Sequence, residues 1–461
     1  MAESFGMNKQ MLVAGGGIGG LAATLAAARA GWEVRLYEQA PVFEEVGAGV
    51  QLGPNVTRIL TAWGLMPELD RVAAHPDRIQ AFDGRSGASL AALPLGARCL
   101  QRYGAPYVTV HRAALHALLL RAVAPLPGVW LRLNTEVQGF RQRDGVVSLD
   151  VATVPDPAVP ADMAGAVGAG PATDAGAALQ PARAGGDEEV SANLRHTTRP
   201  AEATVRTRCH TVEGDVLLGA DGLWSRVREQ LLHDGAPAFT GHLAYRATVP
   251  QAQLPARLRS GQVGVWLAPR LHAVAYPVSA GEALNLVVIV EGEKPAGDPR
   301  SWDHSAHAAQ LQAQLRGHAP ALRDLVEAVP HWRLWPLHDR APMQSPHDHG
   351  QGLVALLGDA AHPMRPYLAQ GAGMAIEDAH ALGRAFAMAE TGVPMDNLLR
   401  HYALNRWARN ARVQARSRRN GRIFHATGPV RWGRNLAMRL LGERLMDVPW
   451  LYRGLDVDLS R

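Results

Sequence analysis

The most constraining feature of the sequence is a glycine cluster that follows directly on a short apolar run. Met11 to Ala14 leads into GGGIGGLAATLAAARAG, which ends at Gly31, and the alternating stretch EVRLYEQ (33–39) comes next. This order predicts a strand, a tight turn, an alanine-rich helix and a second strand. A chain that begins in this way is expected to form an α/β fold around a parallel sheet.

The cluster fits the dinucleotide-binding pattern G-x-G-x-x-G at Gly15, Gly17 and Gly20. Gly15 permits the tight turn, Gly17 lets a pyrophosphate approach the backbone, and Gly20 lets helix and strand pack closely. Glu38 ends the second predicted strand, where a carboxylate can accept hydrogen bonds from ribose hydroxyls. The structural alternative is a glycine-rich turn beside an exposed glutamate. The pattern by itself does not distinguish NAD from FAD.

Two further turns have the same character. The apolar run 353–357 ends in Gly358-Asp359, and after a loop with two prolines a helix is predicted to start near Gly371. Between these two sites, GADG (219–222) separates the strand-like DVLL from the helical WSRVREQLL. Ligands of open α/β sheets bind at the carboxyl ends of strands, so both turns are predicted to line a cofactor site.

The glycine fingerprint, the DG turn and the GD turn, in this order, resemble the class A flavoprotein aromatic hydroxylases. Stretches such as FEEVGAGVQLGPN and HPMRPYLAQGAGMAIEDA resemble the hydroxylases of 6-hydroxynicotinate, salicylate and 3-hydroxybenzoate within that family. The resemblance implies a Rossmann-like FAD-binding domain, an antiparallel-sheet substrate domain and C-terminal helices.

The resemblance also implies which residues bind FAD. Asp359 would hold the ribityl chain, the loop 362–366 would lie against the flavin ring, and the helix after it would direct its N-terminus at the flavin. Asp221 and Arg112 would contact the cofactor, and Val137 would lie near the adenine. The full set of expected FAD ligands is Gly15, Gly17, Gly20, Glu38, Arg112, Val137, Asp221, Asp359, Gly371, Gly373 and Met374.

The activity implied is the hydroxylation of a small hydroxylated aromatic or N-heteroaromatic acid. NADH or NADPH would reduce FAD, and O2 would form a flavin C4a-hydroperoxide that transfers one oxygen atom to the ring. One alternative is a flavin monooxygenase of the same fold that acts on a larger or lipid-like substrate at a membrane surface. Another is a non-catalytic FAD-binding module.

The substrate site is expected between the flavin and the antiparallel sheet. The candidate catalytic residues are Gln51, Tyr245 and His272, and the candidate substrate contacts are Tyr245, Tyr276, Pro366 and Tyr367. Arg246 or Arg365 could bind a substrate carboxylate. Each of these side chains could instead be a packed or solvent-facing structural residue. No metal site is predicted.

The domain organisation follows the motifs. Residues 1–77, 105–240 and 351–400 are assigned to the FAD-binding domain, 78–104 and 241–350 to the substrate domain, and 401–461 to a C-terminal helical segment. Residues 155–203 are rich in Ala, Gly and Pro and lack aromatic side chains, so they are predicted to be a disordered insertion between two strands of a hairpin.

The composition limits the other possibilities. The chain has 461 residues, two cysteines and a net charge of +5, with no long apolar run and no signal-peptide pattern. A cytoplasmic protein is therefore expected, with a small aromatic substrate as partner, no nucleic acid, no stable membrane insertion and a possible homodimer. The Arg-rich segment 406–422 is interpreted as a solvated helix face that pairs with carboxylates, with a surface anchor as the alternative.

Overall fold

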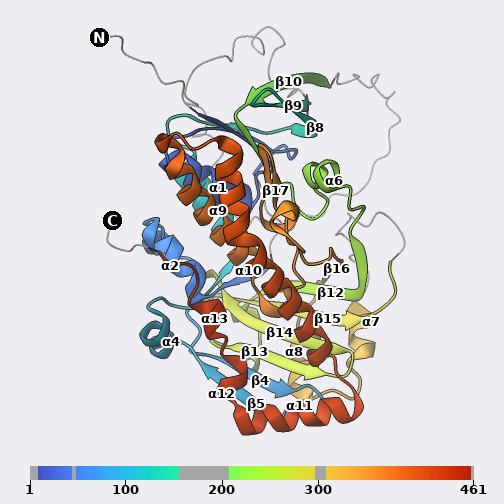
Figure 1. The fold of residues 1–461 in the computed structure, drawn as a ribbon. Coiled ribbons are helices and arrows are strands. Elements are labelled where there is room, and N and C mark those ends of the chain that lie inside the picture. Colours follow the sequence, from blue (N-terminus) through green and yellow to red (C-terminus); the bar gives the residue numbers. More distant parts are fainter. Residues whose placement is uncertain (1–8, 44–47, 155–206, 296–307, 458–461) are drawn as a thin grey trace, which may run out of the picture.

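The computed structural model describes residues 9–43, 48–154, 207–295 and 308–457. Its first sheet has six strands in the order β17-β18-β11-β1-β2-β7, and all neighbours are parallel except β17 and β18 (Figure 1). These strands are β17 (Gly350–Gln351), β18 (Val354–Leu356), β11 (Val216–Gly219), β1 (Gln10–Ala14), β2 (Glu33–Tyr37) and β7 (Val129–Arg132). The predicted parallel sheet at the start of the chain is confirmed.

The helix α1 (Ile18–Arg29) packs against α9 (Gly371–Phe386) on one face of this sheet. Small residues allow the close approach, because a Cβ on Gly383 would lie 3.0 Å from the Cβ of Ala26. At one end of the pair the rings of Trp32 and Phe386 stack with centroids 4.0 Å apart. The small side chains of α1 therefore allow α1 and α9 to pack closely against each other.

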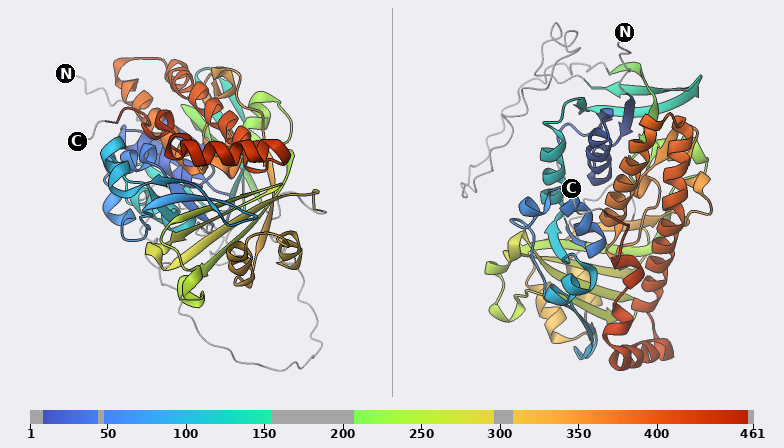
Figure 2. Two further views of the ribbon diagram at one scale, coloured as in Figure 1. Left: turned by 90° about the horizontal axis from the view of Figure 1, so that it is seen from below. Right: turned by 60° about the vertical axis from the view of Figure 1, so that its left-hand side comes forward.

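The second large sheet has seven strands in the order β16-β12-β15-β14-β13-β4-β5, antiparallel except where β13 meets β4. These strands are β16 (Arg333–Asp339), β12 (Ala238–Pro250), β15 (Ala283–Glu291), β14 (Leu271–Val278), β13 (Val263–Ala268), β4 (Arg78–Asp83) and β5 (Ser89–Pro94). One face carries an apolar core with α7 (Ala308–Gln314) and α8 (Pro320–Glu327), and the other faces the part of the molecule built on the parallel sheet (Figure 2).

Smaller elements connect the two sheets and cover their edges. They are β3 (Gly49–Leu52), β6 (Val108–His111), α2 (Pro54–Ala62), α3 (Met66–Leu69), α4 (Gly96–Tyr103), α5 (Arg112–Val123), α6 (Arg226–Leu232), α11 (Gly428–Leu441), α12 (Glu443–Met446) and α13 (Pro449–Tyr452). In the described part of the chain, no helix has both the length and the apolar character needed to cross a bilayer.

The Arg-rich segment lies in α10 (Met395–Phe424), a helix of 30 residues that runs from the parallel sheet to the antiparallel sheet (Figure 1). The predicted pairing with carboxylates is confirmed, but the prediction of a solvated face is wrong for Arg406. Arg406 is completely buried and pairs with Asp378 at 2.7 Å, and Arg418 pairs with Asp339 at 3.1 Å. Arg406, Arg409 and Arg418 therefore join α10 to carboxylates of both domains, whereas Arg412, Arg419 and Arg422 are exposed as predicted.

The predicted hairpin around the insertion is confirmed at its two flanks. In a three-stranded sheet β10-β9-β8, Thr153 of β9 (Val146–Thr153) pairs with Arg208 of β10 (Arg208–Gly214), and β8 (Thr135–Arg143) covers the other edge. The segment predicted to be disordered, 155–203, lies outside the described residues. The domain boundaries given above stay a prediction.

Candidate cofactor and substrate site

The three predicted turns meet at one edge of the parallel sheet. β18, β11 and β1 are adjacent and parallel, so the GD turn, the DG turn and the glycine fingerprint all follow the carboxyl ends of neighbouring strands. Gly15 has φ +101°, and a Cβ at this position would lie only 2.4 Å from the carbonyl oxygen of Ala220. The segments are therefore in direct contact, as one extended cofactor would require.

A cavity of about 420 Å³ opens at this edge. It is lined by Ala14, Gly15, Gly17, Tyr37, Glu38, Gln39, Thr135, Glu136, Val137, Ala220, Asp221, Gly222, Leu223, Trp224 and Arg226. Five of the predicted FAD ligands are among them. Gly20 lies behind the turn, where a Cβ would lie 1.9 Å from the carbonyl oxygen of Gly15, so no larger residue fits.

Glu38 is held in place at this cavity by backbone groups. Its carboxylate accepts hydrogen bonds from the amides of Gly16 at 2.7 Å and Ala40 at 2.8 Å. His116, which the sequence interpretation missed, lies on the other side of the turn, with Nε2 2.8 Å from the carbonyl oxygen of Gly16. The turn and the acidic side chain are thus positioned before any ligand binds, which fits a diol-binding role for Glu38.

Asp221 also caps a helix. Its carboxylate accepts hydrogen bonds from Ser225 Oγ at 2.5 Å and from the amide of Arg226 at 2.8 Å, both at the N-terminus of α6. Burial raises the pKa of Asp221, and these hydrogen bonds oppose that shift. The guanidinium of Arg226 pairs with Glu136 at 2.6 Å. Cofactor contact by Asp221 stays a prediction.

The GD turn places Asp359 beside the start of α9. Gly358 has φ +61°, and a Cβ on Gly371 would lie 3.9 Å from Asp359 Oδ1. The expected role of Met374 needs a correction. The helix begins at Gly371, so the amide of Met374 already donates to the carbonyl of Gln370 at 2.8 Å, and the Met374 side chain is buried. Within α9, only the amides of residues 371–373 precede the first hydrogen bond of the helix, so these amides, and not that of Met374, can point at a ligand.

A buried polar network holds the turn at Gly358 and the start of the following loop in place. Asp378 Oδ2 accepts from the backbone amide of Gly358 and lies 2.5 Å from His362 Nε2, while Oδ1 accepts from Arg406 Nε at 2.7 Å. Burial by itself would raise the pKa of Asp378, but the charges of His362 and Arg406 hold it below its ordinary value. Glu377 pairs with Arg406 and, at 2.6 Å, with Arg409.

One face of α10 holds the proline-containing loop. Gln414, Ser417 and Asn420 donate hydrogen bonds to the backbone carbonyls of Pro363, Arg365 and Tyr367, respectively. The sequence interpretation missed these residues, although their spacing of three places them on one side of a helix. A Cβ on Gly421 would lie 2.6 Å from the Tyr367 ring, so this glycine lets the loop lie against α10.

The strand register corrects the role of Tyr245. Its side chain is buried in the apolar cluster under α7 and α8, opposite Val288 of β15. Alternate residues of a strand point to opposite faces of the sheet. Tyr245 therefore faces away from the parallel sheet, and the next residue, Arg246, faces toward it. The prediction of Tyr245 as a catalytic or substrate residue is therefore wrong.

Arg246 lies among the predicted cofactor and substrate residues. Its guanidinium carbon lies 4.9 Å from the centre of the Trp335 ring. Burial lowers its pKa and Arg112 adds to this, whereas Tyr276 and Asp359 oppose the shift, so all three groups lie in its electrostatic surroundings. In the described structure, the buried Nε atom has no hydrogen-bond partner. Arg365, the other candidate, pairs with Asp339 at 2.6 Å.

The remaining candidates form two groups. Tyr276 donates to the carbonyl of Gly49 at 2.6 Å, and Gln51 accepts from Tyr107 at 2.6 Å, so both lie where β14 meets β3. The ring of Tyr367, which follows Pro366, lies 5.1 Å from that of His272. Burial holds the pKa of His272 well below its ordinary value, and His425 and His242 contribute to this shift.

Two clusters have side chains of metal-binding type. They are His242, Glu291 and His425, and His349, His362 and Asp378. Arg270 lies 3.7 Å from Glu291, and the charges of Arg365 and Arg434 reach the histidines of the first cluster. In the second cluster Arg406 already neutralises the carboxylate. These cations would repel a divalent ion, so we assign no metal to either cluster.

Comparison with known proteins identifies the family. A family described as "FAD binding domain" matches residues 169–417. The chain is 34% identical over 448 residues to a 3-hydroxybenzoate 6-hydroxylase of Polaromonas naphthalenivorans, covering 96% of this chain and 95% of that protein. It is 35% identical over 413 residues to a 6-hydroxynicotinate 3-monooxygenase of Bordetella bronchiseptica, covering 89% and 91%.

The chain belongs to the FAD-dependent aromatic-ring monooxygenases. The crystal structure of Klebsiella pneumoniae HpxO complexed with FAD and uric acid agrees in fold, with a TM-score of 0.72 and 21% identity over 95% of this chain and 94% of that one. The predicted family, fold class and flavin cofactor of this monooxygenase are thereby confirmed. Its individual FAD and substrate ligands stay predictions.

Proposed function

We propose that this monooxygenase hydroxylates a small hydroxylated aromatic or N-heteroaromatic acid, with NADH or NADPH as reductant and O2 as oxidant. The relatives named above act on 3-hydroxybenzoate and 6-hydroxynicotinate. The observation that carries the proposal here is Arg246, a half-buried cation near Asp359 and Tyr276 whose buried Nε has no hydrogen-bond partner in the described structure. A guanidinium with a buried, unsatisfied N–H favours an anionic partner, and a carboxylate fits its planar donors.

The residues at the sheet edge fit FAD in an extended form. The turn carries glycines where a Cβ would clash, and the cavity that they line would hold the pyrophosphate close to the backbone. Glu38 would accept hydrogen bonds from the ribose. Asp359 would hold the ribityl chain, and Gly371 and Gly373 would bring the backbone close to the flavin. When bound, FAD would take a hydride from the nicotinamide and activate O2 for transfer of one oxygen atom.

The protein would then orient the substrate and manage its protons. Arg246 would hold the carboxylate, while Tyr276 and Gln51 would border the ring from β14 and β3 and Pro366 and Tyr367 from the loop. His272, whose ring centroid lies 5.1 Å from that of Tyr367, would accept a hydrogen bond from the phenolic hydroxyl of the substrate. Because burial lowers its pKa, it would polarise that O–H bond and would not hold the proton itself. Closure of these groups around the ring would also exclude water.

The test is a substrate panel with the purified yellow protein. Hydroxybenzoates and hydroxypyridine carboxylates are mixed with NADH or NADPH while reductant oxidation, O2 uptake and product mass are followed. One compound should stimulate reductant oxidation and gain one oxygen atom. If only uncharged or lipid-like arenes do so, the proposed substrate class is wrong. The same panel distinguishes NADH from NADPH.

A further inference from the structure

The helix α11 has its polar and apolar faces reversed relative to an ordinary surface helix. Three of its polar side chains point inward: Arg431 and Asn435 bind Asp83 of β4 at 2.7 Å and 2.6 Å, and Arg434 donates to the carbonyl of Phe424 at 2.7 Å. A surface helix normally buries its apolar stripe and exposes its polar face. Here hydrogen bonds and ion pairs, together with the packing of Met438, attach the helix to the protein, and an apolar stripe on its other face stays exposed.

The outward stripe is large and continuous along the helix. Trp432, Leu436 and Leu440 repeat every four residues, and their side chains are 74%, 58% and 74% exposed. Val430, Leu441 and Leu445 are also exposed. α11 lies at the end of the molecule opposite the β8–β10 sheet, and no helix or strand of the described residues covers its outer face (Figures 1 and 2). Clustered exposed apolar side chains of this size mark an interaction surface.

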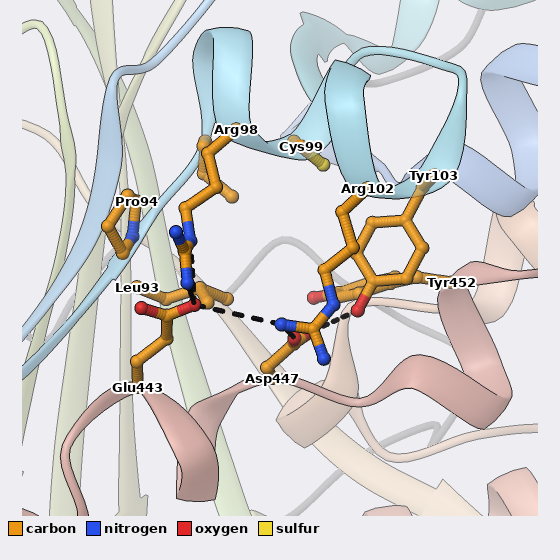
Figure 3. Close-up of a pocket in the computed structure, with 10 residues that line it drawn as sticks. Leu93, Pro94, Arg98, Cys99, Arg102, Tyr103, Glu443, Asp447 and Tyr452 are labelled. Carbon is orange, nitrogen blue, oxygen red and sulfur yellow. Dashed lines mark hydrogen bonds and ion pairs between the residues drawn. The ribbon is translucent and has the colours of Figure 1, made fainter.

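The charges beside the stripe are positive. Arg439 and Arg444 are exposed next to it, and in the described part of the chain no carboxylate pairs with either. The neighbouring acids are already engaged, because Glu443 lies 2.6 Å from Arg98 and Asp447 lies 3.0 Å from Arg102 (Figure 3). Tyr103 donates a further hydrogen bond to Asp447 at 2.5 Å.

These charges decide between two occupants of the stripe. A second copy of the chain, related by a twofold axis, would present the same face, on which Glu443 and Asp447 are already paired, and so would bring no unpaired carboxylate of α12 to Arg439 and Arg444. An anionic lipid surface would instead accept the apolar residues between its acyl chains and the arginines among its head groups. An in-plane helix with Trp and Leu on one face and Arg at its edge has the chemistry of an interfacial anchor.

We propose that α11 docks this monooxygenase peripherally on anionic membrane surfaces, with Trp432, Leu436 and Leu440 entering the interface and Arg439 and Arg444 binding the head groups. The docking is reversible, since one helix face and two cations make a weak anchor. This function is separate from the chemistry at the flavin edge, and it places the antiparallel substrate sheet, to which α11 is bound, next to the membrane.

The test uses the full-length holoenzyme and sedimentation with phosphatidylcholine vesicles, with and without about one-third phosphatidylglycerol. The wild type should bind the anionic vesicles at low salt and release them at high salt. Leu436→Glu should lower the partition coefficient at least about tenfold, and so should the double variant Arg439→Gln/Arg444→Gln. The matched control is Leu404→Glu, which changes a leucine that is 51% exposed on another helix and should bind as the wild type does.

Flavin content and melting temperature show whether each variant is folded, and Trp432→Gln replaces Leu436→Glu if the latter loses flavin. The proposal is overturned if the wild type does not sediment with anionic vesicles at low salt, or if the α11 variants bind like the control. It is also overturned if light scattering shows a dimer that Leu436→Glu dissociates, and if anionic vesicles do not dissociate that dimer. In that case a second copy covers the stripe.

Discussion

At the scale of single residues, Arg246 carries the proposed substrate recognition. Its guanidinium lies against the Trp335 ring, and Tyr276 and Asp359 act against the lowering of its pKa by burial. A bound carboxylate would complete both its hydrogen bonds and its charge balance, so removal of the guanidinium should affect substrate more than cofactor.

We expect Arg246→Gln to raise KM for an aromatic acid about 100-fold, since truncating one partner of a buried charge pair costs about 2–5 kcal/mol. Flavin content should not change, and an analogue without the carboxylate should react equally well with wild type and variant. Steady-state kinetics measure this, with the surface variant Arg257→Gln as control. Equal losses for both substrates would show that Arg246 does not bind the carboxylate.

Asp359 and Glu38 should contribute unequally to FAD binding. Asp359→Ala would remove a carboxylate at the start of α9, and the Kd for FAD should rise about tenfold or more. Glu38→Ala should have a smaller effect, because backbone amides already satisfy part of its hydrogen-bonding capacity. Flavin fluorescence titration of apoprotein measures both, and Asp150→Ala, an exposed carboxylate paired with Arg141, is the control. Wild-type affinity in both variants would contradict the placement.

At the scale of elements, the contact of α9 with α10 depends on charges that are balanced inside the protein. Arg406 faces Asp378 and Glu377, and all three side chains are completely buried. We expect Arg406→Met to lower the free energy of unfolding by about 3–5 kcal/mol, because two carboxylates lose a buried partner. Urea denaturation measures the loss, and Arg400→Met on the exposed face of α10 should be nearly neutral. A similar stability for both variants would disprove the argument.

The same contact should make the protein sensitive to mild acid. Burial lowers the pKa of His349 to about 4. The unfolded chain therefore binds a proton near pH 6.5 that the folded chain takes up only near pH 4, so stability falls as pH decreases through this window. His349 alone accounts for about 3 kcal/mol by this reasoning.

His349→Gln should flatten the decrease in stability between pH 7 and pH 5, as measured by denaturation at both pH values. The exposed His331→Gln variant is the control and should leave the slope unchanged. A slope in His349→Gln as steep as in the wild type would mean that other groups set the acid sensitivity.

The β9–β10 hairpin should tolerate a much shorter connection. Thr153 and Arg208 are paired, so the ends of the segment between them already lie side by side. We expect replacement of residues 155–206 by a short Asn-Gly turn to leave the melting temperature and flavin content close to wild type, because closing a shorter loop costs less entropy. Calorimetry and flavin absorbance check this. A large fall in either would show that the segment contributes contacts.

At the scale of the whole molecule, local patterns predicted the cofactor edge much better than the substrate side. The glycines and acids at strand ends are set by local geometry that any Rossmann-like sheet imposes, and these turns are adjacent in the structure. In β12 the alternation of Leu243, Tyr245, Ala247 and Val249 marks one apolar side, so local pattern does indicate which face Tyr245 lies on. The partners of Arg406 and Gln414 depend on contacts distant in the chain, which one sequence does not reveal.

The length of α10 has a consequence for how ligands enter. Tyr402 near its beginning donates to the carbonyl of Leu356 in the parallel sheet, and the helix ends beside His272 of the antiparallel sheet, where His425 is 2.8 Å away. A continuous helix of this kind resists bending, so the two domains cannot swing apart without breaking it. We therefore expect substrate to enter by displacement of connecting segments at the rim, while the distance between the two sheets stays constant through the catalytic cycle.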